Sequence, residues 1–135
     1  MASAKHPKVG YMTSITSKNE QVKLVDEMKA EMGYQKLTCQ KLSDLTGVSK
    51  SMISQVLIGK RNPSIETLMR MCVGLGFWPS DVIDRELPIE SAIKYIIDGK
   101  KLKDAKRLTG VPVSLLKKFY NDTDFMEHAI FVDED

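Results

Sequence analysis

The sequence is poor in the residues that build metal centres, disulfide frameworks and covalent catalytic sites. It has only two cysteines and two histidines, and His6 and His128 lie close to opposite ends of the chain. Cys39 and Cys72 are far apart, and neither belongs to a Cys-x-x-Cys pair. We interpret them as free thiols in a reducing cytosol. Because a glycine-rich phosphate loop and a nucleophile motif are also lacking, we expect no enzyme, no metal and no other cofactor.

Long apolar stretches are lacking as well. No segment approaches the roughly 18 consecutive apolar residues that can span a bilayer. The N-terminal residues lack the apolar core of a secretory signal. The 135 residues, of which 42% are hydrophobic, can form one ordinary domain or two very small ones. We therefore expect a soluble cytoplasmic protein with no membrane contact.

Charge is distributed unevenly along the chain, although the net charge is only +2. Residues 1–85 and 86–120 each carry an excess of four basic residues, whereas residues 121–135 carry six acidic residues and no Lys or Arg. The folded part of the molecule is therefore expected to be more basic than the net charge indicates.

The densest pattern is LTCQKLSDLTGVSKSMISQVLIGKRNPS at residues 37–64, which predicts two short helices joined by a sharp turn. Thr38 and Ser49 are suitable N-caps for the first and the second helix. Gly47 is placed to end the first helix at a turn where a side chain would be unfavourable. The expected core-facing residues are Leu42 and Leu45 in the first helix, and Met52, Ile53, Val56 and Leu57 in the second.

This pattern resembles that of the Xre/Cro-type repressor family, roughly L-T-Q-x-x-L-A-x-x-x-G-V-S-x-x-x-I-S-x-x-E-x-G-x-R-x-P-S. The matching residues are Leu37, Thr38, Leu42, Gly47, Val48, Ser49, Ile53, Ser54, Gly59, Arg61, Pro63 and Ser64. The resemblance implies a five-helix domain that places its second motif helix in the major groove of DNA. Beyond the motif, helices are expected at about Lys18–Met32, Ile65–Leu75 and Ser80–Ile83.

The resemblance also implies which residues contact DNA. Base contacts in the family come chiefly from the positions of Lys50, Ser51 and Gln55, and backbone contacts come from the turn after the second helix. A glutamine such as Gln55 can pair with N6 and N7 of adenine. We predict base reading by Lys50, Ser51, Ser54 and Gln55. We predict phosphate binding by Thr38, Ser49, Lys60, Arg61 and Asn62.

Two departures from the family pattern are chemically informative. Cys39 stands where the family usually has Gln, which aids phosphate binding there. Met32 and Leu57 stand where the family often buries an Arg–Glu ion pair. Both ends have become apolar together, and an apolar pair can replace a buried ion pair without loss of stability. We therefore expect Met32 and Leu57 to lie in contact.

Leu108-Thr109-Gly110-Val111 repeats Leu45-Thr46-Gly47-Val48 letter for letter. Residues 85–120 therefore resemble a second, degenerate helix-turn-helix, with helices near Pro88–Asp98, Leu102–Thr109 and Pro112–Tyr120. Pro112 and Val113 occupy the positions of Ser49 and Lys50, which makes base reading by this copy unfavourable. Its candidate auxiliary phosphate contacts are Lys103, Lys106, Arg107, Lys117 and Lys118. We expect this half mainly to form a dimer interface or a companion core.

These observations predict an all-α protein. Its expected parts are a flexible basic arm (1–16), a five-helix Xre/Cro-type domain (17–84), a small helical domain (85–120) and an acidic tail (121–135). The expected function is that of a sequence-specific, nucleoid-associated regulator that binds an operator in double-stranded DNA as a homodimer and takes no small-molecule ligand. Family habit indicates a repressor of a phage, plasmid or mobile element.

Two alternatives stay open. In the first, the protein is a tandem reader that uses both motifs on DNA. In the second, it is an antitoxin or adaptor whose C-terminal half binds a protein partner. A groove of basic residues in the C-terminal half would favour the tandem reader. An exposed apolar patch would favour dimerisation or a protein partner, and its members would be Ile93, Ile97, Leu115 and Phe119.

Overall fold

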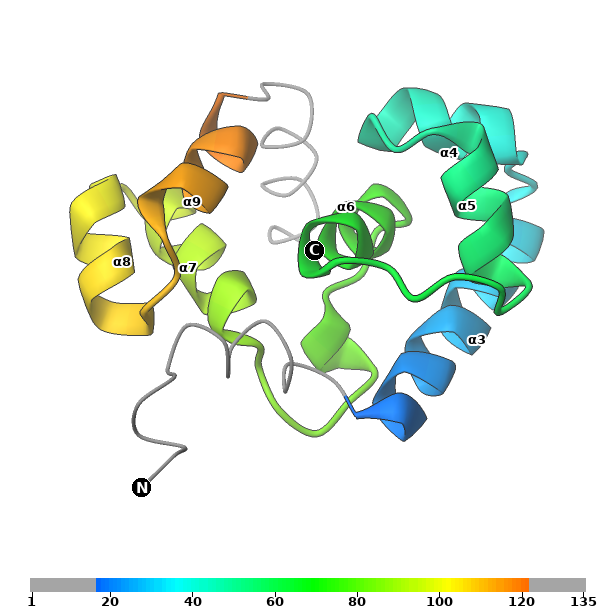
Figure 1. Cartoon of the computed structure of the whole chain (residues 1–135), viewed down its shortest axis with the longest axis horizontal. Helices are drawn as coiled ribbons and strands as arrows, with labels where there is room; N and C mark the ends of the chain where they lie inside the picture. Colours follow the sequence, from blue (N-terminus) through cyan, green and yellow to red (C-terminus); the bar gives the residue numbers. More distant parts are fainter. Residues whose placement is uncertain (1–16, 122–135) are drawn as a thin grey trace.

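The computed structural model describes residues 17–121, and all regular structure within this range is helical (Figure 1). The elements are α3 (Lys18–Gln35), α4 (Cys39–Thr46), α5 (Lys50–Leu57), α6 (Ile65–Gly74), the 3-10 helix η1 (Pro79–Asp81), α7 (Pro88–Ile97), α8 (Leu102–Thr109) and α9 (Val113–Tyr120). The predicted all-α class is confirmed for these residues. The predicted basic arm and nearly all of the acidic tail lie outside them.

Helix α3 begins as predicted and ends later than predicted. Ser17 and Glu20 form a reciprocal capping box, with N···O distances of 2.9 and 3.2 Å. The expected end near Met32 was wrong, because Gly33 stays helical and the helix continues to Gln35. Lys36 then adopts the left-handed conformation that ends it, with φ of 57°. A glycine permits a helix to end but does not require it.

The predicted helix-turn-helix at residues 39–57 is present with its expected caps. The Thr38 hydroxyl accepts a hydrogen bond from the Lys41 N–H at 3.1 Å, and the Ser49 hydroxyl accepts one from the Met52 N–H at 3.1 Å. Gly47 adopts the left-handed conformation at the end of α4, with φ of 76°. Leu45 was wrongly assigned to the core, since it is 41% exposed. The inward face of α4 is formed instead by Leu42 and Thr46, four residues apart on one side of the helix.

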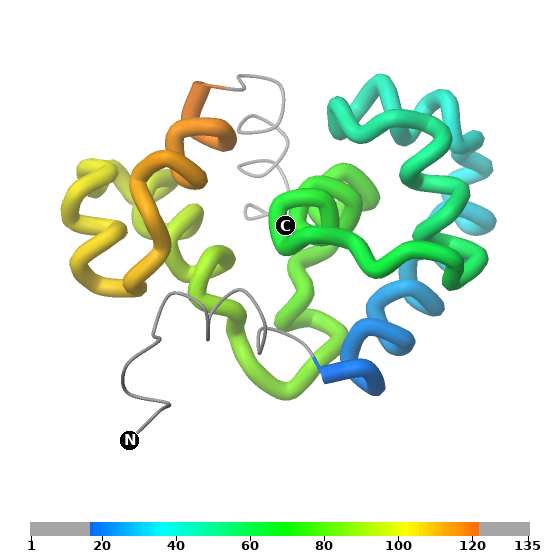
Figure 2. Tube along the Cα trace, in the orientation of Figure 1, coloured from blue at the N-terminus to red at the C-terminus, as the bar shows by residue number. Residues whose placement is uncertain are grey.

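Helix α6 lies between α3, α4 and α5 on one side and α7, α8 and α9 on the other, which we call the two halves of the molecule (Figures 1 and 2). Most of its residues are buried, as expected of a helix covered on all sides. Gly74 permits close approach to α4, because a Cβ there would lie 2.3 Å from Cγ2 of Thr46. The fifth helix of the expected domain is only the 3-10 turn η1, preceded by the buried Phe77 and Trp78.

The C-terminal helices α7, α8 and α9 pack on one another beside α6 (Figure 2). Pro88 occupies the first turn of α7, as predicted. Ile93 and Phe119 are fully buried, while Ile97 and Leu115 are half-buried. These four residues therefore belong to the core of the chain itself rather than to an exposed apolar patch. Met32 and Leu57 are both half-buried against the same core.

Candidate nucleic-acid interface

Helix α5 has one buried and one solvent-facing side. Ile53 and Val56 are buried and fix the helix against the core. The predicted base readers share the opposite side by helical periodicity. Lys50, Ser51 and Ser54 are exposed and Gln55 is half-buried. The structure therefore brings all four predicted base readers together on one accessible surface, which we call the α5 face.

Gln55 is held in place by its neighbours. Nε of Arg61 donates a hydrogen bond to Oε1 of Gln55 at 2.8 Å. Nε2 of Gln55 lies 3.4 Å from Oγ of Ser51, one turn earlier on α5. The sequence assigned Gln55 to the bases and Arg61 to the phosphates as independent contacts. The structure shows instead that the two side chains are joined.

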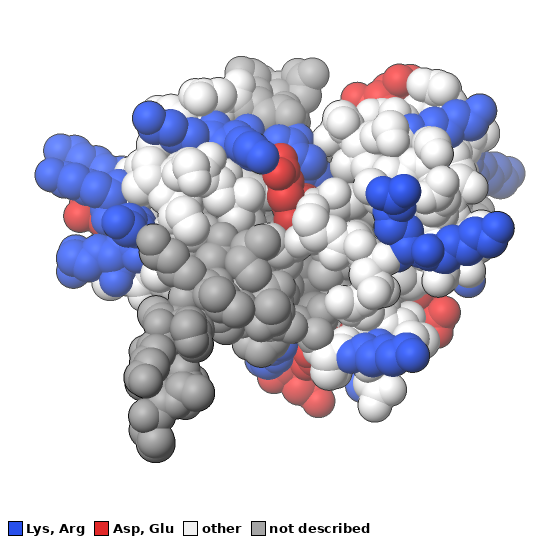
Figure 3. Space-filling view, in the orientation of Figure 1, with Lys and Arg blue, Asp and Glu red and all other residues white. Residues whose placement is uncertain are grey.

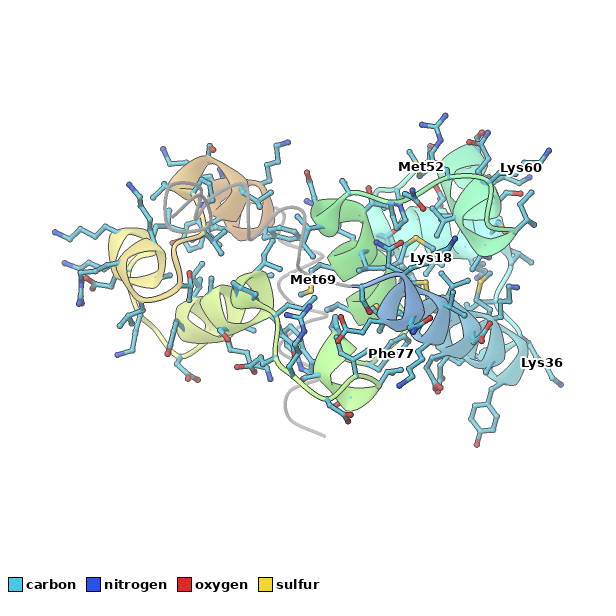
Figure 4. All side chains as sticks on the ribbon, turned by 60° about the horizontal axis from the view of Figure 1, so that its bottom comes forward. Lys18, Lys36, Met52, Lys60, Met69 and Phe77 are labelled. Carbon is cyan, nitrogen blue, oxygen red and sulfur yellow. The ribbon has the colours of Figure 1, made fainter. Side chains whose placement is uncertain are left out.

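The predicted phosphate-binding residues lie next to the ends of α4 and α5, and all five are exposed: Thr38, Ser49, Lys60, Arg61 and Asn62. The last three follow α5, and Figure 4 marks Met52 in the first half of this helix and Lys60 just beyond its end. Thr38 and Ser49 are occupied as N-caps through a lone pair of the hydroxyl oxygen. Each hydroxyl keeps its own hydrogen for donation to a phosphate oxygen.

Helices α8 and α9 repeat the local geometry of α4 and α5. All four helices have eight residues, and α8 and α9 each begin 63 residues after their counterparts (39 to 102 and 50 to 113). The Thr46 hydroxyl donates to the Leu42 carbonyl at 2.7 Å, and the Thr109 hydroxyl donates to the Ala105 carbonyl at 2.7 Å. Each hydroxyl also accepts a hydrogen bond from the valine N–H two residues later, at 3.1 and 3.3 Å.

The surface chemistry of the second helix pair differs from that of the first. Lys117 and Lys118 occupy the positions of Ser54 and Gln55, and half-buried Val113 occupies that of Lys50. All five predicted auxiliary cations are exposed: Lys103, Lys106, Arg107, Lys117 and Lys118. Two of them make ion pairs, Lys118 with Glu66 at 3.3 Å and Arg107 with Asp104 at 3.7 Å. Figure 3 shows Lys and Arg side chains over both halves of the molecule.

Arg70 is an important residue that sequence reasoning missed. It is buried on α6 and donates hydrogen bonds to the Thr46 carbonyl at 3.1 Å and the Lys118 carbonyl at 3.3 Å. It also pairs with Glu66 at 3.3 Å. Arg70 thus joins the end of α4 to α9. The available signal was a lone arginine inside the apolar run of residues 68–75.

The two cysteines lie in different surroundings. Cys39 is half-buried at the start of α4, whereas Cys72 is fully buried in α6. Burial raises the pKa of the Cys72 thiol well above its ordinary range, so this thiol stays protonated and unreactive. Among the helices of residues 17–121, none is long and apolar enough to cross a membrane.

Comparison with known families agrees with this geometry. A family model described as helix-turn-helix matches residues 27–77, which run from within α3 to just beyond α6. The match leaves α7, α8 and α9 outside. No curated protein and no solved structure matches the chain. The α4–turn–α5 unit with its capped helices and exposed α5 face lies within the matched segment, and residues 27–77 therefore form a helix-turn-helix domain of the Xre/Cro-type family.

Proposed function

We propose that this protein is a sequence-specific regulator of transcription that binds double-stranded DNA through the α5 face. The observation that carries the proposal is the set of four polar side chains on the exposed side of α5, in a domain whose family reads DNA with this helix. Each member of the set can donate or accept hydrogen bonds at base edges in the major groove.

The phosphate contacts position α5 in the groove. Lys60 and Arg61 lie beyond the C-terminal end of α5, Ser49 caps its N-terminal end, and Thr38 caps α4. Contacts at both ends of α5 fix its register without reading sequence. We infer that the protein represses transcription by occupying an operator, in the manner of phage, plasmid or mobile-element control proteins. The support for this finer role is the usual role of the family that the motif resembles. Such a protein works in the compartment that holds the DNA.

We infer a supporting role for the C-terminal helices. Val113 cannot replace Lys50 as a base reader, and Pro112 removes an N–H from the start of α9. Lys103, Lys106 and Lys117 remain as auxiliary phosphate contacts that add affinity on any sequence. One observation supports the tandem-reader alternative: α8 and α9 repeat the threonine and valine hydrogen bonds of α4 and α5. A homodimer on two half-sites, about one helical turn of DNA apart, is part of the proposal.

The test is selection of bound duplexes from a randomised pool with the full chain, followed by sequencing. Enrichment of one motif is the expected result. Fluorescence anisotropy titrations then compare the selected duplex with a shuffled one. Lys50→Ala should lower affinity for the selected duplex more than for the shuffled one. Lys23→Ala, an exposed cation of α3 outside the motif, is the matched control and should preserve the preference. Equal affinity of the wild type for all duplexes would contradict a regulator of specific sites.

A further inference from the structure

The hydrogen bond between the side chains of Arg61 and Gln55 affects which base the α5 face can select. We propose that the two side chains act as one hydrogen-donating unit that reads guanine, rather than the adenine that an isolated Gln55 would read. Arg61 then reads the base together with Gln55, in addition to its predicted role as a phosphate-binding cation. The inference rests on the proposed function, since it names the base read by the same surface.

The orientation of the Gln55 amide follows from its partner. A guanidinium has five N–H donors and no acceptor, so the group that faces Nε of Arg61 must be the amide oxygen. The 2.8 Å distance between Nε and Oε1 is that of a good hydrogen bond. The amide nitrogen is therefore the group left to face a ligand. Its contact with Oγ of Ser51 is long, at 3.4 Å, so Nε2 gives up little on turning to a base.

The two purines differ at the edge that such a unit would meet. Bidentate recognition of adenine needs the amide oxygen to accept from N6 and an amide N–H to donate to N7. Arg61 already donates to one of the two lone pairs of Oε1, so the N6 amino group of adenine would have to share this oxygen with a guanidinium, and neighbouring donors repel. Guanine presents only acceptors at this edge, O6 and N7. Both Nε2 of Gln55 and the terminal N–H groups of Arg61 can donate to them.

Position in the fold supports a lasting pairing. Gln55 lies in the last turn of α5, and Arg61 follows in the turn that begins at Gly59, whose φ is 82°. The backbone of this turn is tied to the same residue, because the Lys60 N–H donates to the Gln55 carbonyl at 2.9 Å. The backbone of the loop therefore places Arg61 beside the side chain of Gln55. Both side chains reach solvent, so a base edge can approach them.

The experiment is duplex selection and sequencing with the full-length wild type and three variants. Gln55→Ala identifies the base pair that depends on Gln55, because preference is lost there. At that pair the wild type should favour guanine over adenine by roughly 5- to 150-fold, the discrimination of one bidentate contact. Arg61→Met keeps the length of the side chain and removes every donor, so preference at the same pair should move from guanine to adenine. Lys60→Met removes the neighbouring exposed cation and should weaken all duplexes while leaving guanine preferred.

The outcomes separate the inference from the proposed function. The inference is wrong if the wild type favours adenine at the Gln55-dependent pair, or if Arg61→Met still favours guanine there. In either case the proposed function as a sequence-specific regulator stands. A wild type that enriches no motif overturns the proposed function and the inference with it. Thermal melts followed by circular dichroism accompany each variant. Because both residues lie at the surface, melting temperatures should stay close to the wild-type value.

Discussion

The guanidinium of Arg70 lies over the ring of Phe119, 5.0 Å from its centroid. Arg70 belongs to the matched helix-turn-helix domain and Phe119 to α9, which lies outside it. The same guanidinium donates to the carbonyls of Thr46 and Lys118, in the first and the last helix pair. The two halves are therefore joined by a buried cation on α6 and not only by apolar packing. A cation over an aromatic face that is shielded from water contributes more than one at the surface.

Arg70→Met should lower the free energy of unfolding of the full chain by about 2–4 kcal/mol. The replacement preserves much of the apolar volume but leaves the buried Thr46 carbonyl without a donor that it has in the wild type. Urea denaturation followed by circular dichroism measures the change. Arg107→Met is the matched control, because Arg107 is an arginine on α8 whose side chain is 71% exposed. Its loss should cost less than about 1 kcal/mol. If both variants lose the same free energy of unfolding, Arg70 does not stabilise the junction between the two halves.

Replacing glycine with alanine should lower the free energy of unfolding at two positions and raise it at a third. Gly47 and Gly110 adopt φ of 76° and 81°, so alanine at either should destabilise the chain by about 1–2 kcal/mol. Gly33 is helical, and a Cβ there meets no atom within 4 Å. Gly33→Ala should therefore stabilise the protein by about 0.5–1 kcal/mol. Thermal melts of the three variants check the order. A destabilising Gly33→Ala would place the end of α3 at Met32 after all.

The caps and turns were predictable from sequence because they depend on neighbouring residues. Ser17, Thr38 and Ser49 cap the helices that follow them, and Gly47 makes the turn that its pattern indicates. The repeat of four letters at residues 108–111 likewise identified a second turn with the hydrogen bonds of the first. Short motifs carry their own partners within a few residues, so local chemistry suffices to read them.

Contacts between distant parts of the chain were not predictable in this way. The exposure of Leu45 depends on how α4 packs on α6, since helical spacing alone allowed it an inward position. The two carbonyls that accept hydrogen bonds from Arg70 are 24 and 48 residues away, and no local pattern indicates them. The hydrogen bond between Gln55 and Arg61 could not be predicted without knowing the path of the loop that joins them. A sequence pattern assigns residue types to a face but does not say which polar groups on that face satisfy each other.

Salt dependence should distinguish the auxiliary cations from the base readers. If Lys106 contacts a phosphate, Lys106→Gln should reduce the slope of log affinity against log salt concentration by about one. Its base preferences in duplex selection should match those of the wild type, because phosphate contacts carry no sequence information. Lys29→Gln on α3 removes an exposed cation far from α8 in sequence and is the control with an unchanged slope. An unchanged slope for Lys106→Gln, and likewise for Lys103 and Lys117, would leave the C-terminal half with a structural role alone.

A buried carboxylate in α7 sets a pH dependence of stability. Glu90 is fully buried and accepts hydrogen bonds from the N–H of Ser80, at 3.2 Å, and from its hydroxyl. Lys94 lies 3.4 Å from it and also stands over the ring of Trp78. Burial raises the pKa of Glu90, and the hydrogen bonds from Ser80 and Lys94 offset this only in part. Glu86, which is more exposed, behaves differently: burial raises its pKa, but hydrogen bonds from Lys94 and Ser91 outweigh burial and lower it.

The two carboxylates should therefore act with opposite signs when the pH falls. A raised pKa means that the folded chain binds the Glu90 proton more tightly than the unfolded chain, so stability from this group grows as the pH falls from neutral toward the ordinary value of 4.5. Relative to Glu90→Gln, the wild type should thus gain free energy of unfolding over that interval. Relative to Glu86→Gln, it should lose free energy of unfolding as the pH falls through 4.5, because a lowered pKa favours the ionised form in the folded chain. Urea titrations at several pH values measure both differences, and the same slope for both pairs would show that burial does not govern the ionisation of Glu90.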